Sequence, residues 1–204
     1  MFKSILILLF STLLLLSCSK DGKKKIVSEP SDEEIAIDIY QEGLDALKKG
    51  DAFFAGKKFK EVEALLPHTQ WAAKSSLMAS YADYSRNAYS SSIFGLERHI
   101  NNYPADKNIP YAHYLIAICY YEQILDEKKD LQPLLKAKEK FEFIILQYPE
   151  TDYALDANFK LDLISDQLAA KEMSIARFYM KTEKWIPALN RLKVVVDDYD
   201  RTIF

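Results

Sequence analysis

The feature that most constrains this chain is an internal repeat, in which four segments place the same kinds of residue at the same offsets. The segments are counted from four origins: Gly50, Asn87, Gln132 and Glu183. The residue five positions on is always small: Ala55, Ser92, Ala137 and Ala188. The residue nine positions on is always large and apolar: Phe59, Leu96, Phe141 and Leu192. Repeats of this length with variable insertions are typical of helical-repeat proteins.

These positions have a direct meaning for packing in a pair of helices. A small residue lets two helices approach closely, and a large apolar residue four positions later lies on the same face. Ala55-x-x-x-Phe59 and Ala137-x-x-x-Phe141 match the A-x-x-x-F element of tetratricopeptide repeats. Of the glycines that such repeats carry in their first helix, only Gly43 is present. The sequence predicts an all-α fold, a right-handed tetratricopeptide-repeat solenoid of about four helix pairs over residues 31–204.

Caps and helix-breaking residues set the expected helix ends. Ser31-Asp-Glu-Glu34 has the pattern of a capping box, and Pro67, Pro104 and Pro149 close three of the repeats. The predicted pairs are 31–49 with 52–66, 70–86 with 89–102, 109–125 with 133–147, and 152–181 with 184–199. The charged run 126–131 is expected to be a loop insertion. The length of 152–181 leaves open whether that helix is bent or broken.

The first residues have the pattern of an export signal rather than of a folded segment. Lys3 precedes an apolar run from Ile5 to Leu16 that is shorter than the ~20 residues needed to span a bilayer. We therefore predict a signal peptide over residues 1–17. Leu15-Leu16-Ser17-Cys18 resembles the lipobox of bacterial lipoproteins, which makes Cys18 the expected lipid attachment site; the alternative is an ordinary cleavage site before a cysteine. Residues 18–30 are then a lipidated N-terminus and polar tether.

Composition leaves little room for catalysis, metal binding or nucleic-acid binding. The formal net charge of −3 argues against a nucleic-acid partner, and the chain has only two cysteines and five glycines. His68, His99 and His113 lie too far apart in sequence to form a local metal motif, and no phosphate-binding or G-x-S-x-G motif occurs. We expect no enzyme activity, no cofactor and no metal. Cys119, in an apolar helical run, is expected to be a buried core residue.

The lipobox, the tether, the Tyr-Pro repeat endings and the third-repeat insertion together resemble the BamD family. These are tetratricopeptide lipoproteins of the outer-membrane β-barrel assembly machinery. The resemblance covers essentially the whole chain and is most specific from Tyr148 to Tyr199, where a long helix leads to Trp185-x-x-x-x-Asn190-Arg191. It implies a lipid-anchored adaptor on the periplasmic side of the outer membrane. Ser19, directly after the lipidated cysteine, is consistent with outer-membrane sorting.

The resemblance also implies partners and a partner surface. The expected partners are the barrel subunit BamA, the other lipoproteins of the complex and unfolded outer-membrane protein substrates. Trp185, Asn190 and Arg191 are the expected partner-binding residues, and a guanidinium at Arg191 suits an interface carboxylate. The alternative for Arg191 is a solvated surface arginine. The alternative function is a free tetratricopeptide envelope lipoprotein that binds peptides or glycan-associated partners in pilus assembly or cell-wall coordination.

Two further expectations concern the end of the chain and its tyrosines. Family members carry a fifth helical pair, whereas this chain stops at Phe204, so either the chain is a fragment or another subunit covers its last repeat. Tyrosines at helical spacing are expected mainly in the core and between repeats; the alternative for some of them is a polar tip offered to an extended peptide. They are Tyr81, Tyr84, Tyr89, Tyr111, Tyr114, Tyr120 and Tyr121.

Overall fold

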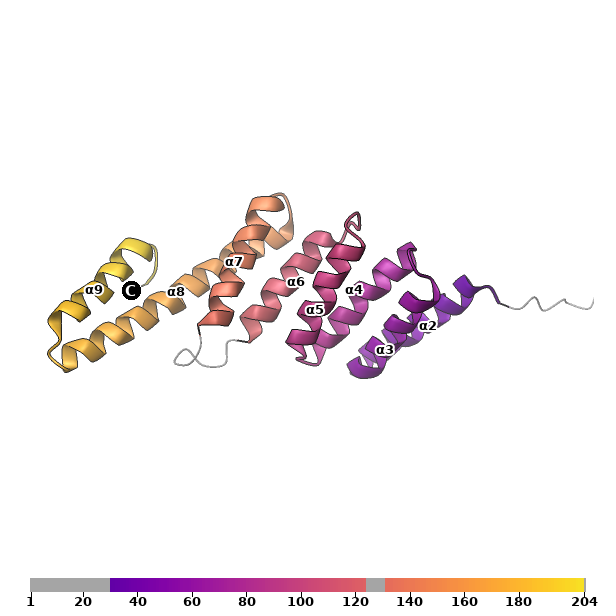
Figure 1. Ribbon diagram of the computed structural model, residues 1–204, viewed down its shortest axis with the longest axis horizontal. Coiled ribbons are helices and arrows are strands. Elements are labelled where there is room, and N and C mark those ends of the chain that lie inside the picture. Colours follow the sequence, from indigo (N-terminus) through magenta and orange to yellow (C-terminus); the bar gives the residue numbers. More distant parts are fainter. Residues whose placement is uncertain (1–29, 124–130, 204) are drawn as a thin grey trace, which may run out of the picture. The chain divides into compact units, whose positions relative to one another are not determined.

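A computed structural model describes residues 30–123 and 131–203, and this part of the chain contains eight helices and no strand. Residues from Ser31 onward form one compact unit. The helices, labelled in Figure 1, are α2 (Asp32–Lys48), α3 (Ala52–Leu65), α4 (Gln70–Ser85), α5 (Tyr89–Asn102), α6 (Ile109–Glu122), α7 (Gln132–Gln147), α8 (Asp152–Lys181) and α9 (Trp185–Asp198). The predicted all-α class is confirmed.

The helices follow one another as packed pairs, as the repeat predicts. Each helix contacts the next along the chain, from α2 on α3 through to α8 on α9, and successive helices run antiparallel. α8 is continuous over all thirty residues, so the open question of a break is answered. α6 ends at Glu122, three residues earlier than predicted. The result is a helical-repeat fold of the tetratricopeptide type.

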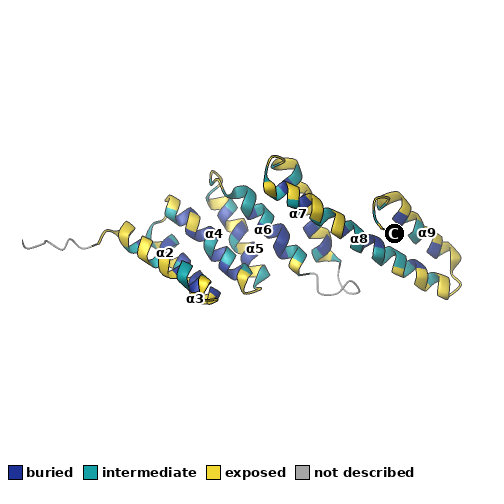
Figure 2. Cartoon of the chain, turned by 180° about the vertical axis from the view of Figure 1, so that it is seen from behind, coloured by how far each residue is buried: buried dark blue, intermediate teal, exposed yellow. Residues whose placement is uncertain are grey.

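The repeat positions occupy the interfaces that they were expected to occupy. Ala55, Ser92 and Ala137 are fully buried and Ala188 is almost so. Phe59, Leu96 and Phe141 are likewise fully buried, whereas Leu192, in the last pair, is only half-buried. Buried residues lie on the faces that neighbouring helices turn toward each other (Figure 2). Because small and large residues alternate there, adjacent helices interdigitate at close range.

Three of the four repeat origins are turn residues in the left-handed backbone conformation. Gly50, Asn87 and Glu183 have φ of 82°, 61° and 58°. Each is followed by a residue whose N–H donates to a carbonyl five positions back, Asp51 to Ala46, for example, at 2.9 Å. This is the Schellman arrangement that satisfies the last carbonyls of a helix. The fourth origin, Gln132, is instead the first residue of α7.

Side-chain caps fix where several helices begin. Ser31 and Glu34 form the predicted capping box, with the Glu34 N–H donating to Ser31 Oγ at 3.2 Å and the Ser31 N–H donating to the Glu34 carboxylate at 2.9 Å. The hydroxyls of Thr69 and Thr151 accept from the first turns of α4 and α8. Thr69 follows Pro67 and Thr151 follows Pro149 by two residues. A proline that ends one helix pair is thus followed directly by the cap that begins the next.

Two residues singled out in the sequence have clear structural roles. Gly43 lies where α2 crosses α3, and a Cβ there would come within 2.8 Å of the Phe59 ring. Cys119 is fully buried in α6, and burial raises the pKa of its thiol to about 11. The thiol is therefore an unreactive core group, as predicted.

Candidate functional site

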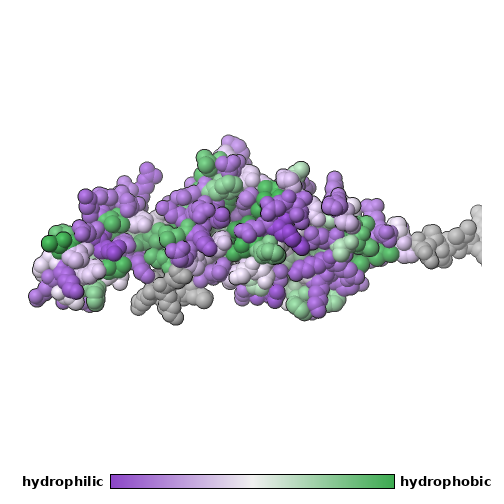
Figure 3. All heavy atoms as spheres, viewed as in Figure 1, coloured by the Kyte–Doolittle hydropathy of each residue, from purple (hydrophilic) through white to green (hydrophobic). Residues whose placement is uncertain are grey.

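Two of the three predicted partner-binding residues lie exposed on α9. Trp185 is the first residue of this helix and 61% exposed, and Asn190 is exposed as well. Three apolar neighbours are still more exposed: Ile186, Leu189 and Val196. Their helical spacing places them on one face, opposite Ala188 and Val195, which pack on α8. Hydrophobic residues come to the surface at this end of the molecule (Figure 3).

Arg191, the third predicted residue, is held by an acidic partner within the chain. Its Nη1 donates to both carboxylate oxygens of Glu172 in α8, at 3.0 and 3.3 Å. The Glu172 side chain is mostly buried and that of Arg191 is 42% exposed. Arg191 is therefore not a merely solvated arginine. Sequence reasoning missed Glu172, which lies about three helical turns before the turn at Glu183, whereas Arg191 lies about two turns after it.

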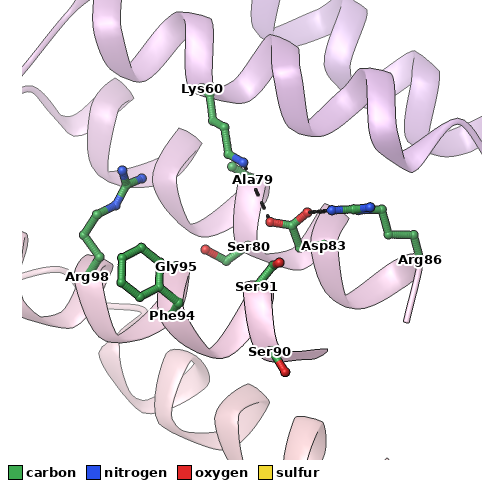
Figure 4. Close-up of a pocket in the computed structure, with 10 residues that line it drawn as sticks. All are labelled: Lys60, Ala79, Ser80, Asp83, Arg86, Ser90, Ser91, Phe94, Gly95 and Arg98. Carbon is green, nitrogen blue, oxygen red and sulfur yellow. Dashed lines mark hydrogen bonds and ion pairs between the residues drawn. The ribbon is translucent and has the colours of Figure 1, made fainter. Parts of the chain in front are cut away.

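A groove of about 400 Å³ lies between α3, α4 and α5, and nothing in the sequence pointed to it. Figure 4 shows the Asp83 carboxylate at its centre, between Lys60 and Arg86. Arg86 donates to Asp83 at 2.8 and 3.0 Å, and the Lys60 ammonium lies 3.8 Å from the second oxygen. Asp83 and Arg86 are an i,i+3 pair at the end of α4, whereas Lys60 comes from α3, so the fold is needed to bring Lys60 to this carboxylate.

The walls of the groove add an aromatic ring, a guanidinium and a glycine. Phe94 is 71% exposed, and Arg98 is held by Glu63 of α3 at 2.8 Å. Gly95 brings α5 close to α4, because a Cβ there would lie 2.5 Å from Ser80 Oγ. The groove thus combines fixed charges of both signs with an exposed aromatic side chain. That combination suits an extended polypeptide better than a small apolar ligand.

The tyrosines are explained mainly by packing. All seven are half-buried and pack against the core cluster that α4 to α8 share. The Tyr114 hydroxyl donates to Asp156 of α8 at 2.6 Å, and burial raises the pKa of Tyr111 and of Tyr114. These contacts join α6 to α8, so they stabilise the repeat stack.

The described residues contain no group of three or more histidine, cysteine, aspartate or glutamate side chains that could hold a metal ion. Within that same part of the chain, every helix is too short or too polar to cross a membrane. Three predicted features lie outside the described residues: the lipid attachment site Cys18, the tether up to residue 29, and most of the 126–131 insertion.

The stacked helix pairs and the exposed α9 face define a helical-repeat protein of the tetratricopeptide type. A family model described as outer membrane lipoprotein, YfiO, matches residues 32–204. The chain belongs to this family, and it is accordingly associated with the outer membrane.

Several curated relatives carry the name outer membrane protein assembly factor BamD. The protein from Caulobacter vibrioides is 38% identical over 186 residues, which are 91% of this chain and 60% of that protein. The protein from Rickettsia prowazekii is 35% identical over 80% of this chain and 65% of its own length. The protein from Neisseria gonorrhoeae is 26% identical over 98% of this chain and 79% of its own length. The chain thus spans less than two thirds of the first two relatives.

Proposed function

We propose that this protein is a non-enzymatic adaptor of the outer-membrane β-barrel assembly machinery. The observation that carries the proposal is its membership of the outer membrane lipoprotein family, together with relatives named outer membrane protein assembly factor that match most of the chain. The adaptor would help to deliver and insert unfolded outer-membrane proteins. Its partners would be BamA and the other lipoproteins of the complex.

The N-terminal sequence supports the attachment that this role needs. Lipidation at Cys18 after removal of residues 1–17 would anchor the protein, and residues 18–30 would tether the repeats on the periplasmic side. A single acyl chain gives only marginal membrane binding, so stable attachment requires the two or more chains of a lipoprotein cysteine.

The α9 face would be the main contact with the barrel subunit. Trp185, Ile186 and Leu189 form an exposed apolar cluster at the start of α9. Interfaces concentrate their binding energy in a few anchors, most often tryptophan, tyrosine and arginine, and Trp185 and Arg191 are residues of this kind. The groove between α3 and α5 would hold an extended segment of an unfolded substrate, since its charges of both signs and Phe94 suit a polar backbone with apolar side chains.

Pull-down of the barrel subunit from detergent-solubilised outer membranes tests the α9 assignment. Leu189→Asp places a charge in the apolar cluster and should remove most of the bound subunit. As a control, Ile37→Asp places the same charge at an exposed apolar residue on α2 and should leave the amount of bound subunit unchanged. Circular dichroism checks that both variants fold. Equal recovery with Leu189→Asp and Ile37→Asp would refute α9 as the contact.

A charge swap separates the two roles that Arg191 can have. Arg191→Glu alone puts two carboxylates together and weakens the α8–α9 contact. The double variant Glu172→Arg/Arg191→Glu restores the internal ion pair but reverses the charge at position 191. If the partner recognises the guanidinium, the double variant stays deficient in binding while its melting temperature recovers. Recovery of both properties would show that Arg191 acts only within the chain.

A further inference from the structure

His99 of α5 is the one histidine among the described residues with a fully buried side chain. Neither ring nitrogen has a hydrogen-bond partner among those residues. His68, by contrast, is exposed in a turn, and His113 is half-buried against Phe143 and Tyr148. A neutral imidazole tolerates a buried site, whereas a protonated one is a cation that requires an acceptor.

Two carboxylates lie near the ring, and both are engaged elsewhere. Glu63 of α3 binds Arg98 at 2.8 Å and accepts from the Tyr103 hydroxyl at 3.4 Å. Asp106, in the turn between α5 and α6, accepts from the Asn108 N–H. Arg98, on the same helix as His99, adds a positive charge. The described residues of α4 and α6, which pack on α5, contribute no charge that shifts the ring.

Burial dominates over these charges and lowers the pKa of His99 below 6.5, although Asp106 and Glu63 act in the opposite direction. The unfolded chain therefore takes up this proton at a higher pH than the folded chain. Well above pH 6.5 the imidazole is neutral in both states and the fold carries no penalty. As the pH falls below 6.5, stability decreases until the folded ring is protonated as well.

We propose that His99 is a pH-responsive element of the second repeat, whose protonation loosens the turn from Tyr103 to Asn108 and the Glu63–Arg98 ion pair. Because neither ring nitrogen has a partner, the imidazolium gains an acceptor when Asp106 or Glu63 moves toward it, and this movement strains the contact of Asp106 with Asn108 or that of Glu63 with Arg98. The first change opens the connection between α5 and α6. The second releases Arg98, which also lines the groove. This element acts within the fold, so it does not depend on what the groove binds.

Thermal unfolding of the full-length chain in mild detergent, followed by circular dichroism from pH 8 to pH 5, tests the proposal. His99→Phe keeps an aromatic ring and removes the proton site. At pH 5.5 the wild type should lose up to about tenfold in its folding equilibrium constant relative to pH 7.5, beyond any loss in the variant. This corresponds to a further fall in Tm of about 3–5 °C. His68→Gln, which removes an exposed imidazole, should follow the wild type.

Hydrogen–deuterium exchange locates the change and does not depend on the variant folding well. On lowering the pH, and after correction for intrinsic exchange, protection should fall at the end of α5 and in residues 103–108. Protection in α8 and α9 should be unaltered. Parallel pH profiles for wild type and a folded His99→Phe would overturn the proposal. So would unchanged protection of residues 103–108 in the wild type at pH 5.5.

Discussion

Two buried glycines in the first helix pair offer a matched test of the packing, because the same substitution should have opposite effects. At Gly43 in α2, an added Cβ would lie 2.8 to 3.1 Å from three atoms of the Phe59 ring. That ring is fully buried and packs at a tilt against the Tyr40 ring, with centroids 5.1 Å apart, so it cannot move freely. At Gly56 in α3, the nearest atoms are Ala82 Cβ at 3.6 Å and Ala79 O at 3.9 Å, which are ordinary contacts.

The magnitudes follow from two effects. Alanine in place of a mid-helix glycine stabilises a helix by about 0.5–1 kcal/mol, and this gain is common to both sites. Overpacking of a full core is destabilising by about 1–3 kcal/mol, and only Gly43→Ala incurs it. Gly56→Ala should therefore raise the free energy of unfolding by about 0.5–1 kcal/mol. Gly43→Ala should leave it unchanged or lower it by up to about 2.5 kcal/mol.

The measurement is urea unfolding of the wild type and the two variants, with thermal unfolding as a second probe. The two variants should differ by about 1–3 kcal/mol, and each kcal/mol corresponds to about 2–4 °C in Tm for a chain of this size. The common helix-propensity gain cancels in this difference, so it isolates the contact with Phe59. Equal stabilisation by both substitutions would refute the close crossing of α2 and α3.

Three other substitutions test separate parts of the account. Ala137→Leu overpacks the buried small position of the third repeat and should be destabilising by roughly 1–3 kcal/mol; an unchanged Tm would mean that the register is wrong. Glu183→Gly removes the strain of a side chain in a left-handed backbone conformation and should raise the free energy of unfolding in urea by up to about 1 kcal/mol. Glu183→Ala keeps that strain and should have little effect. Cys18→Ala should leave an unprocessed precursor that does not partition into the detergent phase with lipoproteins. Mass spectrometry that found an unmodified Cys18 thiol in the mature wild type would disprove lipidation.

The features that could be predicted from the sequence are those determined by residue type and spacing within one helix or turn. The capping box at Ser31 and the buried positions Ala55 and Ala137 follow from residue type and spacing. Helix ends came within three residues wherever a cap or a proline marked them. These features could be read because each is determined within one helix or one turn.

The rest depends on contacts that a single sequence does not encode locally. Glu63 and Arg98 are 35 residues apart, and Glu172 and Arg191 are 19 apart, so neither ion pair has a sequence signature. The groove requires three helices in place before its residues meet. The burial of His99 was equally invisible, because a histidine near the end of an amphipathic helix normally faces water.

Affinity purification of the tagged full-length chain from outer membranes tests the central claim most directly. The purification is done in mild detergent at moderate salt, and the bound proteins are identified by mass spectrometry. Our account predicts that the barrel subunit of the outer-membrane assembly machinery is recovered in near-equal amount and is lost with Leu189→Asp. Recovery of the chain without any barrel subunit, or only with pilus or cell-wall partners, would contradict it and favour a free envelope lipoprotein.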